Sequence, residues 1–486
     1  MARITRRKFI QHSTAASTAF GLFTIGGTKA SGRVLGANDA IRVGVAGIRG
    51  RGQSHIDAFG HELKNENVQI TYLIDPDTRL FESRKSKVAA AGGAEPQCVK
   101  DIRKALEDPN LDAVSVATCN HWHSLITIWA CQAGKDVYVE KPISHNVFEG
   151  RKCVEAARKY GRVVQHGTQQ RSSNEMAREI AAVHSGKYGK LLVSKGYCCK
   201  ARWDIGNKPL ESPPEELDFN LWLGPAPEQS YHGNLVPYNW HWFWDTGNGD
   251  IGNQGVHEID VARWGIKGST LPKSVWSLGG RFGYDDQGQT PNTQMAVFDY
   301  GDALLLFEVR GLVENKERGD VPRNVSNEFY TTEGMIREGK FYAHGGKPGE
   351  NIAGPEASVT PGGSFGSFIR AVRSRKPADN NADAEVAHYS AALCHLANIS
   401  YRLGTSVPYS QAGAKLGDNS QVVESFGAIR DNLKAIGMKL DETNYMLGRT
   451  LAFDPQAEQF VGEGAAEANP LLTRPYRAPF VVPQQV

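Results

Sequence analysis

The stretch IRVGVAGIRGRGQSH, residues 41–55, decides the fold of the first part of this chain. An apolar run rich in Val and Ile leads into a turn with glycine at positions 47, 50 and 52, and a helical pattern follows. A buried strand that enters a helix through a glycine-rich turn is the first unit of a doubly wound α/β sheet. We therefore expect strand and helix to go on alternating along the chain.

The alternation runs through residue 167. Strands are expected at four further runs rich in β-branched residues, namely QITYLID, DAVSVAT, DVYVEKP and RVVQHG. Helical patterns separate them, near residues 52–60, 78–90, 101–107, 123–133 and 146–160. Nearly continuous apolar strands between helices predict a parallel sheet covered on both faces. In such a sheet the ligand binds beyond the carboxyl ends of the strands.

Beyond residue 170 the pattern changes. Runs such as KSVWSLGGRFGY and ALLLFEVRG alternate with Gly, Asn and Asp turns, which favours a mixed or antiparallel sheet. Helical periods follow in residues 365–402, and prolines beyond residue 450 predict a tail that runs extended over the surface. The expected units are a Rossmann domain (38–168), a sheet domain (169–410), and a C-terminal helical segment with an extended tail (411–486).

Composition limits the possible classes of protein. At ~150 residues per domain, 486 residues make about three units, or two domains with additions. With 40% hydrophobic and 22% charged residues the chain can bury a large core, which excludes a disordered, collagen-like or coiled-coil protein. Residues 1–30 hold five basic and no acidic residues, so the net charge of +2 leaves −3 on the remainder. A slightly acidic body gives no electrostatic reason to expect nucleic acid as a partner.

Residues 1–30 are predicted to be a targeting segment. TRRKFIQ, residues 5–11, joins an arginine pair to Phe9, and no charged residue follows before Lys29. A twin arginine before a mildly hydrophobic run, with small residues ending at Ala30, resembles a twin-arginine export signal. We therefore expect the twin-arginine export machinery as a partner, a periplasmic or otherwise exported location, and no stable membrane insertion. A disordered or amphipathic leader and an uncleaved anchor are the alternatives.

Cysteine usage fits folding in a reducing compartment before export. The seven cysteines show no metal-type spacing, and their odd number argues against a disulfide framework. No set of His, Cys and carboxylate residues stands at a recognisable ligand spacing, so no metal is predicted.

The turn at residues 47–52 has most features of a dinucleotide-binding fingerprint. That fingerprint uses one glycine for the tight turn, a second for close approach of a pyrophosphate and a third for helix packing. Gly47 and Gly52 have the first and third spacings, whereas Arg49 stands at the second. We expect Gly50 to allow the close approach instead, and Arg49 or Arg51 to meet the phosphates. Alone, the motif is also compatible with a glycine turn that binds no cofactor.

An acidic residue stands where the second strand should end. Asp75 follows Gly47 by 28 residues, and a carboxylate there accepts hydrogen bonds from the ribose hydroxyls of adenosine. It also repels a 2′-phosphate, so NAD is predicted in preference to NADP. Taken alone, Asp75 is equally compatible with a turn residue before Pro76. Strand, glycine turn and Asp75 together favour cofactor binding.

Two further loops should open on the same crevice, because each follows a strand of the predicted sheet. In EKP, residues 140–142, Pro142 fixes the backbone after Lys141, which projects a cation from a strand end. In ATCNHWHSL, residues 117–125, His123 and, less strongly, His121 are candidates for ligand binding or for capping the next helix. The alternative for Lys141 is a solvated loop residue.

The second domain supplies the segment YNWHWFWDTGNGDIGNQGVHEIDVARW, residues 238–264. Asn253 and His257 are four residues apart, so they share a face on one helical turn, with Asp260 three residues further. Histidine is suited to exchange a hydroxyl proton near neutral pH. Trp240 and its aromatic neighbours are candidates for a platform under a sugar ring. Core packing is the alternative for Trp240 and for His257.

Together, the glycine turn, ATCNHWHSL, EKP and GNQGVHEID resemble the Gfo/Idh/MocA oxidoreductases, the family of glucose–fructose oxidoreductase and inositol dehydrogenase. The resemblance covers about residues 40–400. It implies a Rossmann domain, an open-faced and largely antiparallel sheet domain through which copies form homo-oligomers, NAD(P), and a sugar, polyol or glycoside substrate. Lys141 matches the family's active-site lysine and His257 its catalytic histidine, while Asn253 stands where many members have aspartate.

The residues expected at the cofactor are Gly47, Arg49, Gly50, Arg51, Gly52, Asp75, Thr118, Asn120, His123, Glu140 and Lys141. Those expected at the substrate are Lys141, Trp240, Asn253 and His257, with Lys141, His257 and Asn253 as the catalytic group. The sequence thus favours NAD-dependent oxidation of a secondary hydroxyl. A redox-neutral glycoside-cleaving enzyme with tightly held NAD and a non-catalytic sugar- or partner-binding protein are the alternatives.

Overall fold

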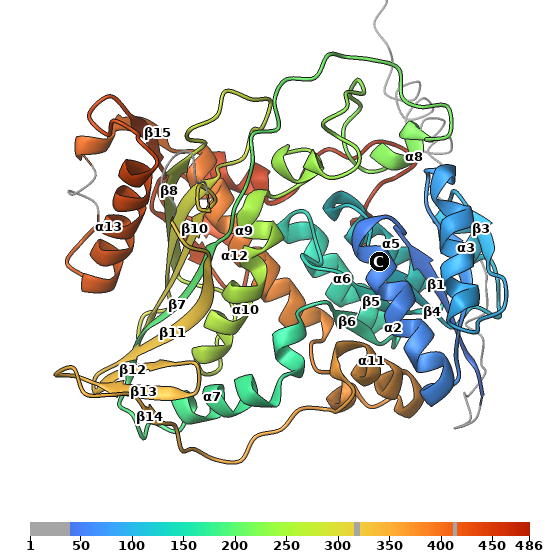
Figure 1. Ribbon diagram of the computed structural model, residues 1–486, viewed down its shortest axis with the longest axis horizontal. Coiled ribbons are helices and arrows are strands. Elements are labelled where there is room, and N and C mark those ends of the chain that lie inside the picture. The colour runs from blue at the N-terminus through green and yellow to red at the C-terminus, as the bar shows by residue number, and fades with distance from the viewer. Residues whose placement is uncertain (1–38, 315–320, 412–415) are drawn as a thin grey trace, which may run out of the picture.

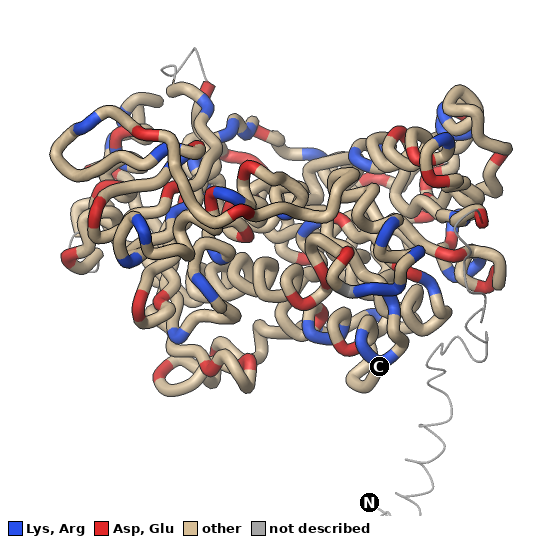
Figure 2. Tube along the Cα trace, turned by 90° about the horizontal axis from the view of Figure 1, so that it is seen from below, with Lys and Arg blue, Asp and Glu red and all other residues tan. Residues whose placement is uncertain are grey.

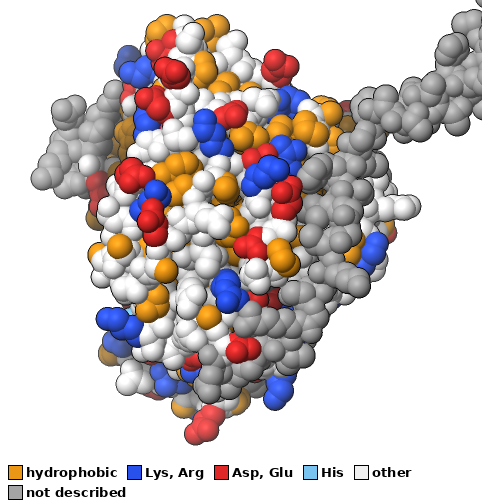
Figure 3. All heavy atoms as spheres, turned by 90° about the vertical axis from the view of Figure 1, so that its right-hand side faces the viewer, with side chains coloured by type: hydrophobic (Ala, Val, Ile, Leu, Met, Phe, Trp, Pro, Cys, Tyr) orange, Lys and Arg blue, Asp and Glu red, His pale blue; other side chains and the backbone are white. Residues whose placement is uncertain are grey.

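The computed structural model describes residues 39–314, 321–411 and 416–486 (Figure 1). The predicted export signal, residues 1–30, lies outside these ranges. Within them, no helix combines the length and the apolar character needed to cross a membrane. Charged residues of both signs are interspersed along the chain in Figure 2, and neither sign dominates the face drawn in Figure 3.

The first domain is the predicted parallel sheet, with strand order β3-β2-β1-β4-β5-β6. Its strands are β1 (Ile41–Ala46), β2 (Val68–Ile74), β3 (Gln97–Val99), β4 (Ala113–Val116), β5 (Asp136–Val139) and β6 (Val164–His166). The order reverses between β1 and β4, and a ligand crevice opens at such a point beyond the strand ends. The doubly wound fold is thereby confirmed.

Helices cover both faces of this sheet. They are α2 (Gly50–Glu66), α3 (Phe81–Ala90), α4 (Ile102–Leu106), α5 (Asn120–Gln132) and α6 (Val147–Lys159), in agreement with the predicted helical stretches. One helix comes from far along the chain: α11 (Gly363–Ser374) packs its apolar face with β1 and α2 (Figure 1). The sequence placed this helix in the second domain, because its period shows an apolar face but not which sheet that face covers.

The second domain is a mixed, largely antiparallel sheet of 12 strands. The strands are β7 (Leu191–Cys199), β8 (Ser274–Gly280), β9 (Thr293–Asp299), β10 (Leu304–Arg310), β11 (Asn324–Thr331), β12 (Gly334–Arg337), β13 (Lys340–Ala343), β14 (Glu350–Asn351), β15 (Thr405–Pro408), β16 (Asn444–Leu447), β17 (Leu451–Asp454) and β18 (Gln459–Val461). Within this second sheet, β7 and β10 form the only parallel pair among the described strands. The remaining pairings explain the alternation of short strands with turns in the sequence.

Each face of this sheet carries its own helices. On the face toward the Rossmann domain lie α10 (Gly255–Gly265) and α12 (Ala384–Arg402), which share one apolar cluster with β8, β9 and β10 (Figure 1). On the outer face, α13 (Ser420–Ala435) packs over a second cluster. The helices α10 and α12 therefore stand between the two sheets and set their spacing.

The C-terminal part is more ordered than an extended tail. Within 411–486, three of the strands, β16, β17 and β18, pair directly or through one another with the second sheet. The chain then crosses to the first domain, where Phe480 and Val482 are buried with residues of α4 and α5. Strands this short are hard to distinguish from loop in a sequence, because three or four residues give too little alternation to recognise.

Candidate active site

A cavity of about 500 Å³ lies beyond the carboxyl ends of the Rossmann strands. Its floor comes from the ends of β1, β2, β4 and β5, and one wall from Asn253 of the second domain. The opposite side is formed by residues 214–243, which we call the roof; it contains α8 (Phe219–Leu223). Size and position match a ligand pocket at the switch point of a doubly wound sheet.

The glycine turn provides bare backbone at the cavity. Gly47 has φ +79°, and a Cβ there would come within 2.6 Å of the Ala117 backbone. At Gly52, a Cβ would lie 1.9 Å from the Gly47 carbonyl oxygen, so only glycine fits. Gly50 begins α2 with no atom within 4 Å of its Cβ position from residues beyond its chain neighbours and the nearby helix backbone, and no side chain caps that helix. An open, uncapped N-terminus of a 17-residue helix suits a pyrophosphate.

The two arginines of the turn are already paired with carboxylates. Arg49, at the second fingerprint position, contacts Asp77 at 2.5 Å between Nη2 and Oδ2. Arg51 donates from Nε to Oε1 of Glu140 at 2.7 Å. Both residues line the cavity, and each guanidinium group is held by its carboxylate partner. The ion pair with Asp77 thus ties the Arg49 side chain to the loop after β2.

Asp75 holds the glycine turn from below. Its two carboxylate oxygens accept hydrogen bonds from the backbone N–H groups of Ile48 at 2.9 Å and Asp77 at 3.0 Å. Burial raises the pKa of Asp75 to about 6, although both donors favour the charged form. Asp75 does line the cavity, as predicted, but so does Asp77, whose carboxylate also pairs with Arg79. The end of β2 thus presents two carboxylates and two guanidinium groups.

Glu140, at the end of β5, is the centre of a buried polar group. His55 lies 3.1 Å from its Oε1 and on the other ring nitrogen contacts the Ser115 hydroxyl at 2.7 Å. Burial disfavours the charged carboxylate. The His55 hydrogen bond and the charges of Arg51 and Lys141 outweigh this effect of burial. They hold the pKa of Glu140 well below its usual range. Glu140 is therefore ionised and fixes one end of the β5 loop.

Lys141 joins the two domains. Its Nζ donates to the Asn253 backbone oxygen at 2.5 Å and lies 3.3 Å from the Asn253 side-chain oxygen. Burial lowers the pKa of Lys141, and the nearby carboxylates, Glu140 first among them, oppose that shift. Both Lys141 and Asn253 line the cavity. A cation held at a strand end by neutral acceptors can stabilise negative charge on a bound ligand.

His257 stands on α10, one turn beyond Asn253. The helix is interrupted at Gln254, since α9 (Gly249–Asn253) ends there and α10 begins at Gly255. Burial, and after it the Lys141 ammonium, lower the pKa of His257 to about 3. The ring is therefore neutral and close enough to Lys141 to respond to its charge. It is not among the residues that line the cavity, whereas Asn253 is.

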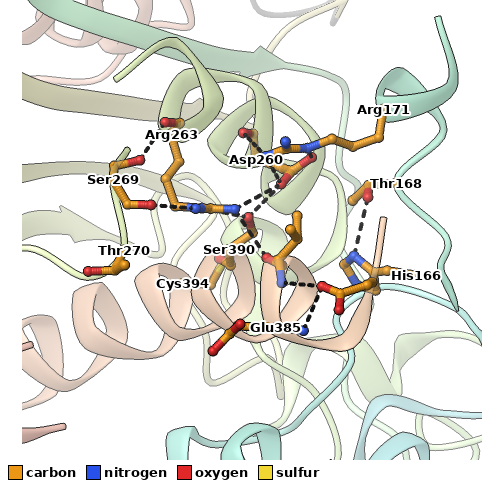
Figure 4. Close-up of polar contacts among 12 residues, drawn as sticks. His166, Thr168, Arg171, Asp260, Arg263, Ser269, Thr270, Glu385, Ser390 and Cys394 are labelled. Atoms are coloured by element: carbon orange, nitrogen blue, oxygen red, sulfur yellow. Dashed lines mark hydrogen bonds and ion pairs between the residues drawn. The ribbon is translucent and has the colours of Figure 1, made fainter. Parts of the chain in front are cut away.

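A buried ionic network holds α10 in place (Figure 4). Asp260 accepts from Arg171 at 2.8 and 3.0 Å and from the Ser390 hydroxyl at 2.6 Å. Arg263 also donates to Ser390, at 3.1 Å. These residues come from the segment after β6, from α10 and from α12, so the network links the segment that leaves the Rossmann domain to both inner helices. It fixes the helix that carries His257.

The predicted loop after β4 contributes mainly to the walls. Thr118, Asn120 and His123 all line the cavity. Both ring nitrogens of His123 contact backbone carbonyl oxygens, of Pro142 at 2.6 Å and of Thr118 at 3.0 Å. Asn120 donates to Asn248 of the second domain at 3.0 Å. His123 and Asn120 thus brace the crevice through contacts within the protein.

The roof brings a histidine that the sequence did not single out. His241 lines the cavity and stacks on the predicted Trp240, with ring centroids 3.6 Å apart. Its Nδ1 lies 2.6 Å from the Tyr238 carbonyl, which can only accept, so Nδ1 carries the hydrogen and Nε2 is left as the acceptor. Burial lowers the pKa of His241 to about 3, which keeps it neutral.

Asp77 and Glu258 were also missed. Asp77 repeats the acidic residue two positions after Asp75, which was the available signal. Burial raises the pKa of Glu258 to about 8, and its Oε2 has no hydrogen-bond partner. Both Glu258 and His241 stand in segments that hold predicted site residues, GNQGVHEID and YNWHWFW, but the predictions fell on their neighbours His257 and Trp240. Among the described residues, no group of three or more His, Cys, Asp or Glu is placed to hold a metal ion.

Two family descriptions match the chain. Residues 41–168 match the GFO_IDH_MocA oxidoreductase family, NAD-binding Rossmann fold, and residues 182–280 match the C-terminal α/β domain of the same oxidoreductases. A myo-inositol 2-dehydrogenase of Thermotoga maritima is 31% identical over 32% of this chain and 43% of that protein. A glycosyl hydrolase family 109 protein of Shewanella pealeana is 24% identical over 42% of this chain and 48% of that protein. The chain spans less than half the length of these curated relatives.

Solved structures extend the likeness over most of the chain. The WlbA dehydrogenase of Bordetella pertussis, solved with NADH and UDP-GlcNAcA, is 19% identical with a TM-score of 0.55, covering 75% of this chain and 97% of that one. Levoglucosan dehydrogenase, solved with NADH and levoglucosan, is 17% identical with a TM-score of 0.53, covering 74% and 97%. At these identities the likeness shows the shared fold.

Proposed function

The chain belongs to the Gfo/Idh/MocA oxidoreductase family, and we propose that it is a NAD-dependent enzyme that oxidises a secondary hydroxyl of a sugar, polyol or glycoside. The observation that carries the proposal is the contact of Lys141 with Asn253 in the wall of one cavity. At this contact, Lys141 at the edge of the Rossmann sheet meets the helices α9 and α10 of the second domain. The glycine turn at residues 47–52, which fits a pyrophosphate, lies beside it.

The residues at the crevice fit NAD. The uncapped start of α2 at Gly50 would take the pyrophosphate, and Asp75 and Asp77 would hold the adenosine ribose. When bound, NAD accepts a hydride from the substrate carbon. Glu140 and Lys141, which follow β5, border the end of the cavity where the second domain begins.

Two groups of the chain act on the substrate hydroxyl in this proposal. The surrounding protein and the Lys141 ammonium lower the pKa of His257, so the ring is neutral and in the form that accepts the hydroxyl proton. Lys141 places a positive charge at the same wall and stabilises the developing alkoxide. Asn253 holds Nζ of Lys141 through two oxygens, which sets the position of that charge before the substrate binds.

The test has two stages. Ligands released from the natively purified protein are identified by mass spectrometry, and the protein is then mixed with sugars, polyols and glycosides while nicotinamide absorbance is recorded. Bound NAD and an absorbance increase with one substrate class support the proposal. A protein that binds no NAD contradicts it and favours a non-catalytic binding protein.

A redox-neutral glycoside-cleaving enzyme is the second candidate, and His241 favours it. Cleavage by oxidation, elimination, water addition and reduction needs a proton acceptor beyond the one that serves the hydroxyl. His241 supplies a second neutral imidazole in the cavity wall. The similarity to a glycosyl hydrolase family 109 protein supports the same reading. In this case a glycoside would be cleaved by the NAD-loaded protein with no accumulation of NADH.

We also propose twin-arginine export and homo-oligomers that form through the second sheet. Changing Arg6 and Arg7 to Lys should leave folded, uncleaved protein in the cytosol, and unchanged export would contradict this route. Sedimentation velocity at micromolar protein tests the assembly, and a monomer alone would contradict it.

A further inference from the structure

The roof is hydrogen-bonded to the edge of the Rossmann sheet. The backbone N–H of Thr78 donates to the Glu216 oxygen at 3.1 Å, and that of Asp218 donates to the Pro76 oxygen at 3.0 Å. These bonds join the roof to the loop after β2, which lines the cavity. A dinucleotide that leaves the crevice on this side must therefore separate the roof from this edge.

Trp122 is the second attachment of the roof. Its Nε1 lies 3.0 Å from the carbonyl oxygens of both Leu221 and Trp222, and its ring lines the cavity. The fit is close, since a Cβ on Gly224 would come within 2.2 Å of the ring. The ring also has aromatic neighbours on the Rossmann side, Trp129 at 6.0 Å and Phe480 of the tail at 5.4 Å between centroids. Trp122 thus stands between the roof and the C-terminal tail.

The tail also contacts the roof directly. Arg477 donates from Nη2 to the Asn220 backbone oxygen at 2.7 Å, and from Nη1 to the Asn220 side-chain oxygen. Arg474 donates to the Asp245 oxygen at 2.9 Å, just beyond the roof, and its Nε lies 3.2 Å from Glu149 of α6. Phe480, 1% exposed, anchors this segment in the Rossmann core.

We propose that residues 473–482 form a clasp that keeps the roof closed over the crevice, so that bound NAD leaves slowly and is retained as a resident cofactor. The inference rests on the proposed function, because it requires a dinucleotide in this cavity. The clasp is anchored on both sides, by Leu472 in the core of the second domain and by Phe480 in the first. Opening the roof therefore breaks contacts with the tail as well as with the Rossmann edge.

The experiment measures release of NADH from the full-length protein by its fluorescence, after mixing with excess NAD. In Arg477→Ala and Phe480→Ala we expect release at least ~10-fold faster than in wild type, because each change removes contacts that hold the roof or Trp122. Arg477→Lys should recover part of the loss. The matched control is Arg449→Ala, which removes an exposed pair with Glu467 that does not touch the clasp.

Hydrogen exchange of residues 214–224 provides a second readout that does not depend on activity. Exchange there should be faster in Arg477→Ala, while the melting temperature stays near that of wild type. Equal release rates in wild type and Arg477→Ala, or rapid release from wild type, would overturn the clasp but leave the proposed function intact. Failure of wild type to bind NADH at all would overturn both.

Discussion

The Lys141 ammonium donates to the Asn253 backbone oxygen at 2.5 Å and lies 3.3 Å from its side-chain oxygen, across the boundary between the two domains. The Asn253 amide gives the ammonium no counter-charge at this point, whereas an aspartate at position 253 would supply one. Burial lowers the pKa of Lys141. The pKa of Lys141 can therefore be changed by a single substitution at position 253.

Asn253→Asp should raise the pKa of Lys141, because a carboxylate beside Nζ favours the charged amine. If the protonated amine stabilises the alkoxide, the basic limb of the pH–rate profile should move up by ~1–2 units. The profile is measured with the substrate found in the panel, and the exposed Asn110→Asp serves as control. An unmoved basic limb would count against this role of Lys141.

His257→Ala should lower turnover by roughly 10²–10⁴, the usual share of general acid–base catalysis. NAD affinity, measured by titration calorimetry, should stay within about twofold, because the histidine acts on the substrate. His344→Ala, at an exposed position, is the matched control. Near-wild-type turnover in His257→Ala would shift the assignment to His241.

Asp77→Ala should move the cofactor preference toward NADP. The change removes a carboxylate at the end of β2 and frees Arg49 and Arg79, which can then pair with a 2′-phosphate. We expect the ratio of NADP to NAD affinity to rise by at least ~10-fold. Asp57→Ala, which breaks an exposed pair with Lys87, should leave the ratio unchanged. If Asp77→Ala changed the affinities for NAD and NADP equally, the adenosine ribose would not bind at Asp77.

Glu258→Gln should stabilise the protein at alkaline pH. Burial raises the pKa of Glu258 from 4.5 to about 8, so folding favours the protonated form, and the free energy of unfolding falls as the pH rises between these values. The glutamine stays neutral, so above pH 8 the variant should be more stable by roughly 2–5 kcal/mol and below pH 5 nearly equal. Urea unfolding at pH 5 and pH 9 measures the difference, with the exposed Glu356→Gln as control. A pH-independent difference would contradict the assignment.

Several features of the site could be read from local sequence. The glycine turn fixed the strand–turn–helix unit, because Gly47 and Gly52 leave no space for a Cβ. The position of Lys141 after β5 placed it at the cavity, since the carboxyl ends of parallel strands meet at one edge. Asn253 also lies at this cavity, although the interruption of the helix at Gln254 was not foreseen.

Other features depended on tertiary contacts. The local pattern gave Asp75 as the ribose ligand, but only the structure shows both its oxygens bonded to backbone N–H groups, with Asp77 beside it in the cavity. The roof, His241 and the clasp had no motif, since aromatic residues in a loop look the same whether they pack in a core or cover a crevice.

The sequence by itself determined the alternating strands and helices of the first domain and the strand-rich character of the second, because these follow from hydrophobic period and from the backbone freedom of glycine between near neighbours. Only the tertiary structure decided which of these segments meet. Lys141 and Asn253 are 112 positions apart, and Asn220 and Arg477 are 257 apart. Such contacts are set by how the two sheets pack against α10, α12 and the tail, and that packing depends on the fit of many side chains together rather than on any one stretch of sequence.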